Sequence, residues 1–144
     1  MIAQLGHRLK VEKSDQVLTS FAGLPLLTEL AHTVGLVRGL NAIAGLWERR
    51  GTYQTSDYVL GLAMTLTAGG SGLDDMRVLR EDPGLRAMTL PGLPAANSLG
   101  DFLRRFKHRT IAGLAGVNAK MLRRVLAEWE HKVLTLDIDS SLVE

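Results

Sequence analysis

At the centre of the chain lies the run Thr55-Ser56-Asp57-Tyr58-Val59-Leu60-Gly61-Leu62-Ala63-Met64-Thr65-Leu66-Thr67. Its apolar residues recur at helical spacing, and they occupy nearly the whole circumference of a helix. A helix that is apolar all round is normally buried on every side. We therefore expect this run to form the central, most buried helix of the fold, with Thr55 or Ser56 as its cap.

Two further helices are expected before the central run. The first begins after Gly23-Leu24-Pro25, because Pro is tolerated in a first turn, and its apolar pattern ends at Gly35. The same pattern then resumes and continues to Trp47, where Arg49-Arg50-Gly51 offers an end with cations in the last turn. Upstream, alternating apolar and polar residues over 16–21 predict a short strand.

Strong breaks divide the following part of the chain. Gly69-Gly70-Ser71-Gly72 ends the central helix, and the next helix starts with Asp74-Asp75, whose carboxylates suit the positive end of a helix dipole. Asp82-Pro83-Gly84 is a second stop. Leu90-Pro91-Gly92-Leu93-Pro94 breaks both helix and strand ladders, so it is the expected internal boundary.

Two amphipathic helices are expected after this boundary. The first has Ser98 and Asp101 at the spacing of a capping box, and an apolar stripe made of Leu99, Phe102, Leu103 and Phe106. The second runs from about Thr110 to Trp129. It is expected to bury its apolar residues, which are Ile111, Leu114, Met121, Leu122, Val125 and Trp129.

The end of the chain contains an acidic strand pattern, Lys132-Val133-Leu134-Thr135-Leu136-Asp137-Ile138-Asp139-Ser140-Ser141. Apolar residues fall on both faces of an extended chain, which indicates a strand covered on both sides with acids at its carboxyl end. Carboxylates clustered there suit Mg²⁺, which prefers a few carboxylates together with water and phosphate oxygens. The alternative is a strand that runs out into a solvated acidic turn, and the pattern alone favours neither.

Cations gather on the two amphipathic helices. They are Arg104, Arg105, Lys107, Arg109, Lys120, Arg123 and Arg124. Placed on the solvent faces of adjacent helices, they are suited to neutralise DNA phosphates, which gives affinity without sequence information. The plainer interpretation is the solvated face of an amphipathic pair.

Composition excludes several classes of protein. The chain of 144 residues has no cysteine, so disulfides and thiolate metal sites are excluded, and this suits the cytoplasm. No secretory signal and no apolar run long enough to cross a bilayer are present, so no membrane partner is expected. The four histidines are scattered without ligand spacing, and the net charge of +2 says little about partners.

Several motifs in this order resemble those of DDE transposases from bacterial insertion sequences, of the kind classed as DDE domain group 1. The resemblance covers most of the chain, and no single motif in it is specific. Its residues are Phe21-Ala22-Gly23-Leu24-Pro25-Leu26-Leu27, the turn Gly69 to Asp75, Leu79-Arg80-Glu81-Asp82-Pro83-Gly84-Leu85, Leu93-Pro94 through Ser98 with the helix Phe102-Leu103-Arg104-Arg105-Phe106, and Leu134 to Ser141.

The resemblance implies a mainly α chain, the helical amino-terminal region of a transposase that ends in the first β-strand of a truncated RNase H-like α/β domain. The family's first strand carries the first acid of an Asp-Asp-Glu triad, usually before small or hydroxyl residues. That position matches Asp139, which precedes Ser140-Ser141, and Asp137 is its rival. The implied chemistry is phosphoryl transfer on DNA with two Mg²⁺ ions, and Asp139 would be a metal ligand.

The resemblance also implies a division into a helical DNA-binding or positioning region, residues 1–130, and one strand of an incomplete catalytic domain, residues 131–144. The triad's later acids are expected further downstream, so we expect a transposase fragment that is inactive alone and binds Mg²⁺ tightly only in the complete enzyme. Its partner would be transposon-end DNA, with self-association or association with a full-length transposase. The alternatives are a non-enzymatic DNA-binding or regulatory module, such as an inhibitor of a full-length transposase, and a purely structural helical domain.

Overall fold

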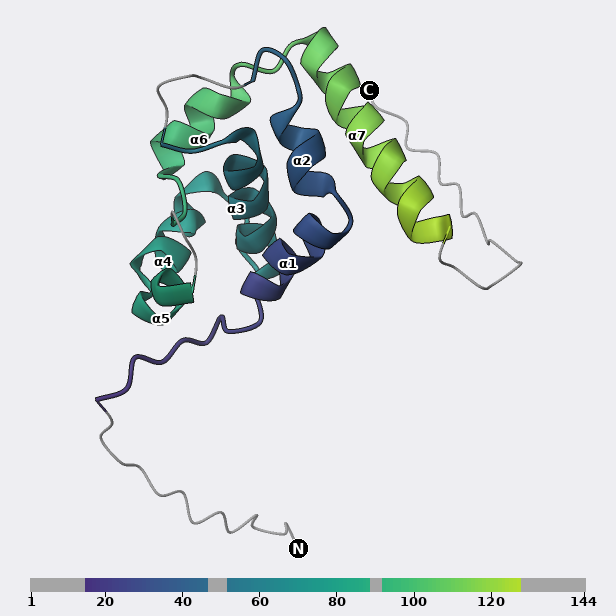
Figure 1. Cartoon of the computed structure of the whole chain (residues 1–144). Helices are drawn as coiled ribbons and strands as arrows, with labels where there is room; N and C mark the ends of the chain where they lie inside the picture. Colours follow the sequence, from purple (N-terminus) through teal and green to yellow (C-terminus); the bar gives the residue numbers. More distant parts are fainter. Residues whose placement is uncertain (1–14, 47–51, 89–91, 128–144) are drawn as a thin grey trace, which may run out of the picture.

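The computed structural model describes residues 15–46, 52–88 and 92–127. Within these ranges every regular element is helical (Figure 1). The elements are α1 (Pro25–Thr33), α2 (Leu36–Asn41), α3 (Thr55–Thr67), the 3₁₀ turn η1 (Leu73–Asp75), α4 (Met76–Glu81), α5 (Pro83–Met88), α6 (Ala96–Leu103) and α7 (His108–Ala127). The expectation of a mainly helical chain is confirmed for the described residues.

The strand expected over 16–21 is wrong. This segment is irregular and passes into a turn before α1. Val17 and Leu18 are 63% and 68% exposed, and Thr19 lies against Gly84 instead of joining a sheet. Alternation predicts a strand only where a neighbouring strand pairs with it, and none lies within the described ranges.

Helix α3 lies in the middle of the bundle, as the sequence predicts (Figure 1). It contacts α1, α2 and α4, and it buries Leu60 and Met64. Its burial is nevertheless incomplete, because Leu66 is 58% exposed near the carboxyl end. The apolar pattern thus predicted correctly that this helix is central. It predicted a more complete burial than the neighbouring helices provide.

The cap of α3 differs from the expected one. The residue before the helix is Gln54, whose N–H donates to Asp57 Oδ2 at 2.7 Å. Asn41, the last residue of α2, accepts the Ser56 N–H on its Oδ1 at 2.8 Å and donates to Gln54 Oε1 at 2.6 Å. The helix is thus capped partly by a side chain from another helix, which sequence spacing alone does not predict.

The glycine-rich turn after α3 is a helix terminator, as predicted. Gly69 has φ +89°, and a Cβ on Gly70 would lie 2.6 Å from Thr65 Cγ2. The Ser71 and Gly72 N–H groups donate to Asp75 Oδ2 at 2.8 and 2.9 Å. These bonds lower the pKa of Asp75, with the bond from Gly72 contributing most.

Helix α2 is shorter than its apolar pattern predicts. It ends at Asn41, and the chain then forms turns in which Ile43 and Leu46 are buried. Trp47 and Arg49-Arg50-Gly51 lie outside the described residues. The break comes where Asn41 turns to cap α3, so a tertiary hydrogen bond overrides the helical period.

The expected boundary at 90–94 does not separate two cores in the described part of the chain. Leu93 packs against both apolar clusters, and its carbonyl accepts hydrogen bonds from Tyr53 Oη at 3.2 Å and Arg80 Nε at 3.0 Å. Met76 before the segment and Phe102 after it share one cluster. Leu90 and Pro91 lie outside the described residues, and residues 92–94 are irregular but packed.

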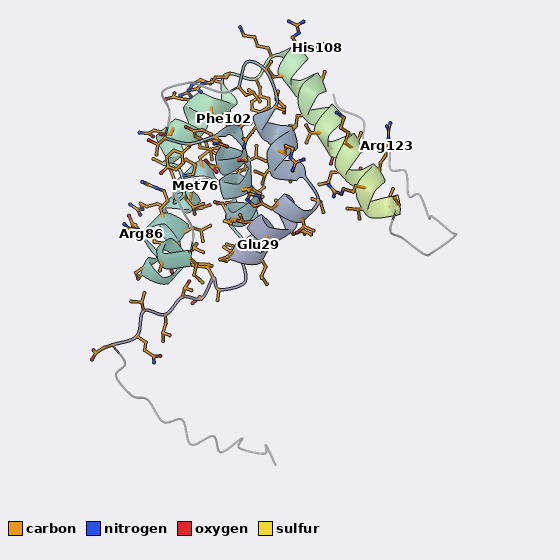
Figure 2. All side chains as sticks on the ribbon, in the orientation of Figure 1. Glu29, Met76, Arg86, Phe102, His108 and Arg123 are labelled. Carbon is orange, nitrogen blue, oxygen red and sulfur yellow. The ribbon has the colours of Figure 1, made fainter. Side chains whose placement is uncertain are left out.

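Among the described residues, helix α6 supplies the largest fully buried side chain. Phe102 is 1% exposed, stacks on Tyr58 with ring centroids 4.5 Å apart, and meets Phe106 edge-on at 5.3 Å. Figure 2 shows Phe102 directed from α6 into the bundle. The helix begins after Ala95, so the cap expected at Ser98 is wrong, and Leu103 is 37% exposed.

Helix α7 lies along one side of the bundle, beside α2 (Figure 1). Its expected burial is wrong, because Thr110 is its one buried residue within the described range. Ile111, Leu122 and Val125 are 55%, 47% and 46% exposed, while Leu114 and Met121 are half-buried. No helix of the described ranges is long and apolar enough to cross a bilayer.

Candidate nucleic-acid interface

The seven cations predicted to bind DNA fall at two ends of α7. Four lie around the junction of α6 and α7, namely Arg104, Arg105, Lys107 and Arg109. The other three, Lys120, Arg123 and Arg124, lie more than two helical turns further along α7. All are exposed except Arg105, which is half-buried. The structure therefore divides the predicted patch into two groups.

The junction group is partly neutralised. Arg104 Nη2 lies 2.6 Å from Asp101 Oδ1, one helical turn away, with both side chains largely exposed. Lys107 precedes α7, and its N–H donates to Thr110 Oγ1 at 2.8 Å, while the same hydroxyl donates to the Lys107 carbonyl. The Lys107 backbone thus helps to start α7, and its side chain is exposed.

Helix α7 packs on α2 through glycines on both sides. A Cβ on Gly39 of α2 would lie 2.8 Å from Val117 Cγ1 of α7. A Cβ on Gly113 of α7 would lie 3.1 Å from Ile43 Cγ2, just beyond α2. Absence of these two Cβ atoms lets the helices approach closely, which sets the shape of the surface between them.

Two adjoining hollows follow this α2–α7 contact, and both have Gly39, Ala42, Val117 and Lys120 in their walls. The charged residues of the first are Arg38, Lys120 and Arg124, and those of the second are Arg109 and Lys120. No Asp or Glu is among the described residues that line either hollow. We call the two hollows together the α2–α7 groove.

Sequence reasoning missed Arg38. This residue lies in the last turn of α2, far along the chain from the other cations, and its side chain is exposed. Only the packing of α7 on α2 brings Arg38, Lys120 and Arg124 to one hollow. A local charge count gives no signal for it, because nothing near Arg38 in sequence marks which helix will pack there. Arg123 is not among the described residues that line the groove.

A different hollow has the opposite character. It lies between α1, α3 and the segment from α5 to α6, and its titratable residues are Glu29, His32 and Asp57. Asp57 already accepts the Gln54 N–H on Oδ2 at 2.7 Å. Figure 2 shows Glu29 on α1. This hollow is lined by two carboxylates, whereas the α2–α7 groove is lined by cations.

The predicted metal ligands, Asp139 and its rival Asp137, lie outside the described residues. Within the described ranges no three His, Cys, Asp or Glu side chains are grouped so that they could hold a metal ion. His32 and His108 are exposed, the first in the last turn of α1 and the second at the start of α7. His7 and His131 lie outside the described residues.

Comparison with protein families places the chain beside known transposases. The family described as "Transposase DDE domain group 1" matches residues 3–144, which is most of the chain. Comparison with curated proteins and with solved structures gave no match.

Proposed function

The chain belongs to the transposase family with a DDE domain of group 1, and on this premise we propose that its helical region binds transposon-end DNA. The observation that carries the proposal is the series of cations at the α6–α7 junction, along α7 and in the α2–α7 groove, whose described lining residues include no Asp or Glu. Cations that neutralise phosphates release counterions from DNA, and this term supplies most of the non-specific affinity. We propose that this binding takes place in the cytoplasm.

The proposed DNA contacts are not equivalent. Lys120 and Arg124 line the groove, and Arg109 lines its second hollow. Arg104 forms an ion pair with Asp101, with Nη2 2.6 Å from Oδ1. The carboxylate offsets part of its positive charge, so Arg104 attracts phosphate less strongly than an exposed arginine without such a partner. Arg105, Lys107 and Arg123 are assigned to the edges of the interface, where a duplex lying along α7 would pass.

The catalytic part of the proposal concerns residues outside the described ranges. DDE transposases generally use a divalent metal, and we assign the first metal-binding carboxylate to Asp139, with Asp137 as the rival. When bound, Mg²⁺ activates water or a 3′ hydroxyl and stabilises the leaving oxygen during DNA strand cleavage and transfer. We propose that Asp139 lies at the carboxyl end of the first strand of an RNase H-like domain, and that the 144-residue chain binds DNA without cleaving it.

A titration with DNA tests the binding proposal. We expect Arg104→Gln, Arg105→Gln, Arg123→Gln and Arg124→Gln together to weaken binding to a labelled DNA duplex and to flatten its salt dependence. The control is Arg77→Gln with Arg86→Gln, because both side chains are exposed on α4 and α5, away from α7. Equal binding by the fourfold variant and the native chain would refute the proposal.

A second candidate is a regulatory module that pairs with a full-length transposase or with a second copy of this chain. The observation in its favour is the exposed apolar side of α7, formed by Ile111, Leu122, Val125 and Leu126. Light scattering of the chain alone and mixed with a full-length family member tests it. Hetero-association without DNA binding would favour this candidate over the first.

A further inference from the structure

The charges of the α2–α7 groove are unbalanced. Arg38, Lys120 and Arg124 line one hollow, and no carboxylate is among the described residues that line it. Arg124 lies close to the backbone, since a Cβ on Gly35 would be 3.1 Å from its Nη1. Like charges brought together repel one another unless an anion joins them, so the hollow favours a ligand with several negative charges.

The floor of the groove offers little with which to recognise bases. Apart from the cations, its described residues are glycine, alanine, valine, isoleucine and methionine. Amide side chains, which read adenine by paired hydrogen bonds, and carboxylates, which accept from cytosine, are not among them. Cations above an apolar floor suit phosphate groups, which position a protein on DNA but carry no sequence information directly.

The groove is long enough for several phosphates. Arg109 lines its second hollow and Arg124 its first, and the two lie fifteen residues apart along α7. At about 1.5 Å per residue, this separation corresponds to roughly 22 Å along the helix. One DNA strand carries a phosphate about every 3.4 Å along the duplex axis, and its phosphates lie farther apart than this along the winding strand itself, so the groove spans several phosphates but fewer than about six.

The shape of the groove is fixed by the close contact between its two helices. Val117 packs on Gly39, and Ile43 packs on Gly113, so the two helices are in close contact at both points. The contact thereby holds Arg38 of α2 opposite Lys120 and Arg124 of α7. Cations that are already in place lose less conformational freedom on binding than cations on a mobile segment.

We propose that the α2–α7 groove holds the phosphate backbone of one DNA strand, with Arg38, Lys120 and Arg124 as its contacts, and that it adds affinity without sequence preference. This inference rests on the proposed function and deepens it, because it names the strand backbone as the ligand and Arg38 as a binding residue. It also distinguishes the contacts Arg38, Lys120 and Arg124 from the three cations Arg104, Arg105 and Lys107, which lie at the junction of α6 and α7 and do not line the groove.

Two matched variants test the inference. The groove variant is Arg38→Gln, Lys120→Gln and Arg124→Gln, and the junction variant is Arg104→Gln, Arg105→Gln and Lys107→Gln. Each removes three positive charges from the full chain. Both are titrated with a short fluorescein-labelled DNA duplex of arbitrary sequence, over about 50 to 200 mM salt, and circular dichroism checks that each variant keeps its helices.

The logarithm of the binding constant falls linearly with the logarithm of the salt concentration, and each phosphate contact makes this slope steeper by about one. The groove variant should therefore lose roughly three units of slope, and roughly 100-fold or more in affinity near 0.1 M salt. An unchanged slope in the groove variant, with a reduced slope in the junction variant, would overturn the inference and leave the proposed function standing. No change in either variant would overturn both.

A second measurement tests the absence of sequence preference. The native chain and the groove variant are titrated with two duplexes of unrelated sequence and equal base composition. The ratio of their affinities should be the same for both duplexes within about twofold, because phosphate contacts are common to all sequences. A ratio that differs tenfold or more between the duplexes would mean that the groove reads bases, and would overturn this part of the inference.

Discussion

Helices α6 and α7 follow one another in the chain, and each carries an apolar stripe. The stripe of α6 is buried, whereas that of α7 is mostly exposed. α6 is 8 residues long and buries Leu99, Gly100 and Phe102. α7 is 20 residues long and has Thr110 as its one buried residue within the described range. The stripe of α6 faces Tyr58 and Met76, whereas much of the stripe of α7 faces solvent. Apolar periodicity thus predicts a helix, but it does not predict that other elements cover its face.

The bundle from α1 to α6 and helix α7 differ in what they contribute to the molecule. The bundle from α1 to α6 holds the apolar core, in which Leu40, Met76, Leu85 and Leu99 are completely buried. α7 adds little to that core and instead forms one wall of the basic groove. Substitutions in the bundle should therefore affect stability, and polar substitutions on α7 should affect binding.

The largest effect is expected in the core. Phe102→Ala removes a ring that is 1% exposed and packed against Tyr58 and Phe106, so we expect a loss of about 3–5 kcal/mol in the free energy of unfolding. The comparison on α7 is Leu122→Ala, which also shortens an apolar side chain but at a residue that is 47% exposed. It should change the free energy of unfolding by less than about 1 kcal/mol. Urea denaturation measures both, and similar losses would contradict the contrast between the helices.

The next effect concerns the joint between the two parts. Gly39→Ala places a Cβ 2.8 Å from Val117 Cγ1, so we expect a destabilisation of about 1–3 kcal/mol, reduced by the better helix propensity of alanine. Gly116→Ala on α7 is the control, because a Cβ at this position would meet nothing within 4 Å.

Removing the side chain that obstructs the new methyl group completes this test. Val117→Ala combined with Gly39→Ala should recover part of the loss, and thermal denaturation of the single and double variants gives the interaction free energy. Gly39→Ala as stable as Gly116→Ala would mean that α7 does not approach α2 as closely as described.

A smaller effect is expected at the cap that α2 provides for α3. Asn41→Ala removes the acceptor of the Ser56 N–H and the donor to Gln54, and should destabilise the bundle by about 1 kcal/mol. Asn41→Asp keeps an acceptor for Ser56 and should lose less. Equal losses in chemical denaturation would show that the Ser56 bond is not the stabilising one.

The smallest effect is restricted to acid pH. The N–H bonds from Gly72 and Ser71 lower the pKa of Asp75 in the folded chain, so its contribution is present above the unfolded carboxyl pKa and is lost as pH falls through the lower, folded value. Asp75→Asn removes this titration. The stability difference between the native chain and this variant should shrink as pH falls through that window, and a difference independent of pH would refute the role of the Asp75 charge.

Local patterns predicted much of the fold because they depend on local physics. Pro25 at a helix start, the Gly69 turn and the Asp74-Asp75 helix start are set by backbone geometry and by nearby hydrogen bonds. The errors arose where distant residues decide. Asn41 shortens α2 by capping α3, and the burial of α7 depends on which elements lie beside it.

The candidate site follows the same rule. Lys120 and Arg124 were predicted from a local concentration of charge, and the structure places both in the groove. Arg38 was missed because it joins them only through the Gly39–Val117 contact between two helices that are distant in sequence. The roles of Asp137 and Asp139 stay predictions, since both residues lie outside the described ranges.

Lysine footprinting tests the binding site most directly. Within the described ranges the lysines are Lys107 at the α6–α7 junction and Lys120 in the α2–α7 groove, and both are exposed. Acetylation of each is followed by mass spectrometry with and without a saturating DNA duplex. We predict that DNA slows the acetylation of Lys120 severalfold and protects it more than Lys107. Unchanged acetylation of Lys120 while the chain is fully bound to DNA would contradict the account.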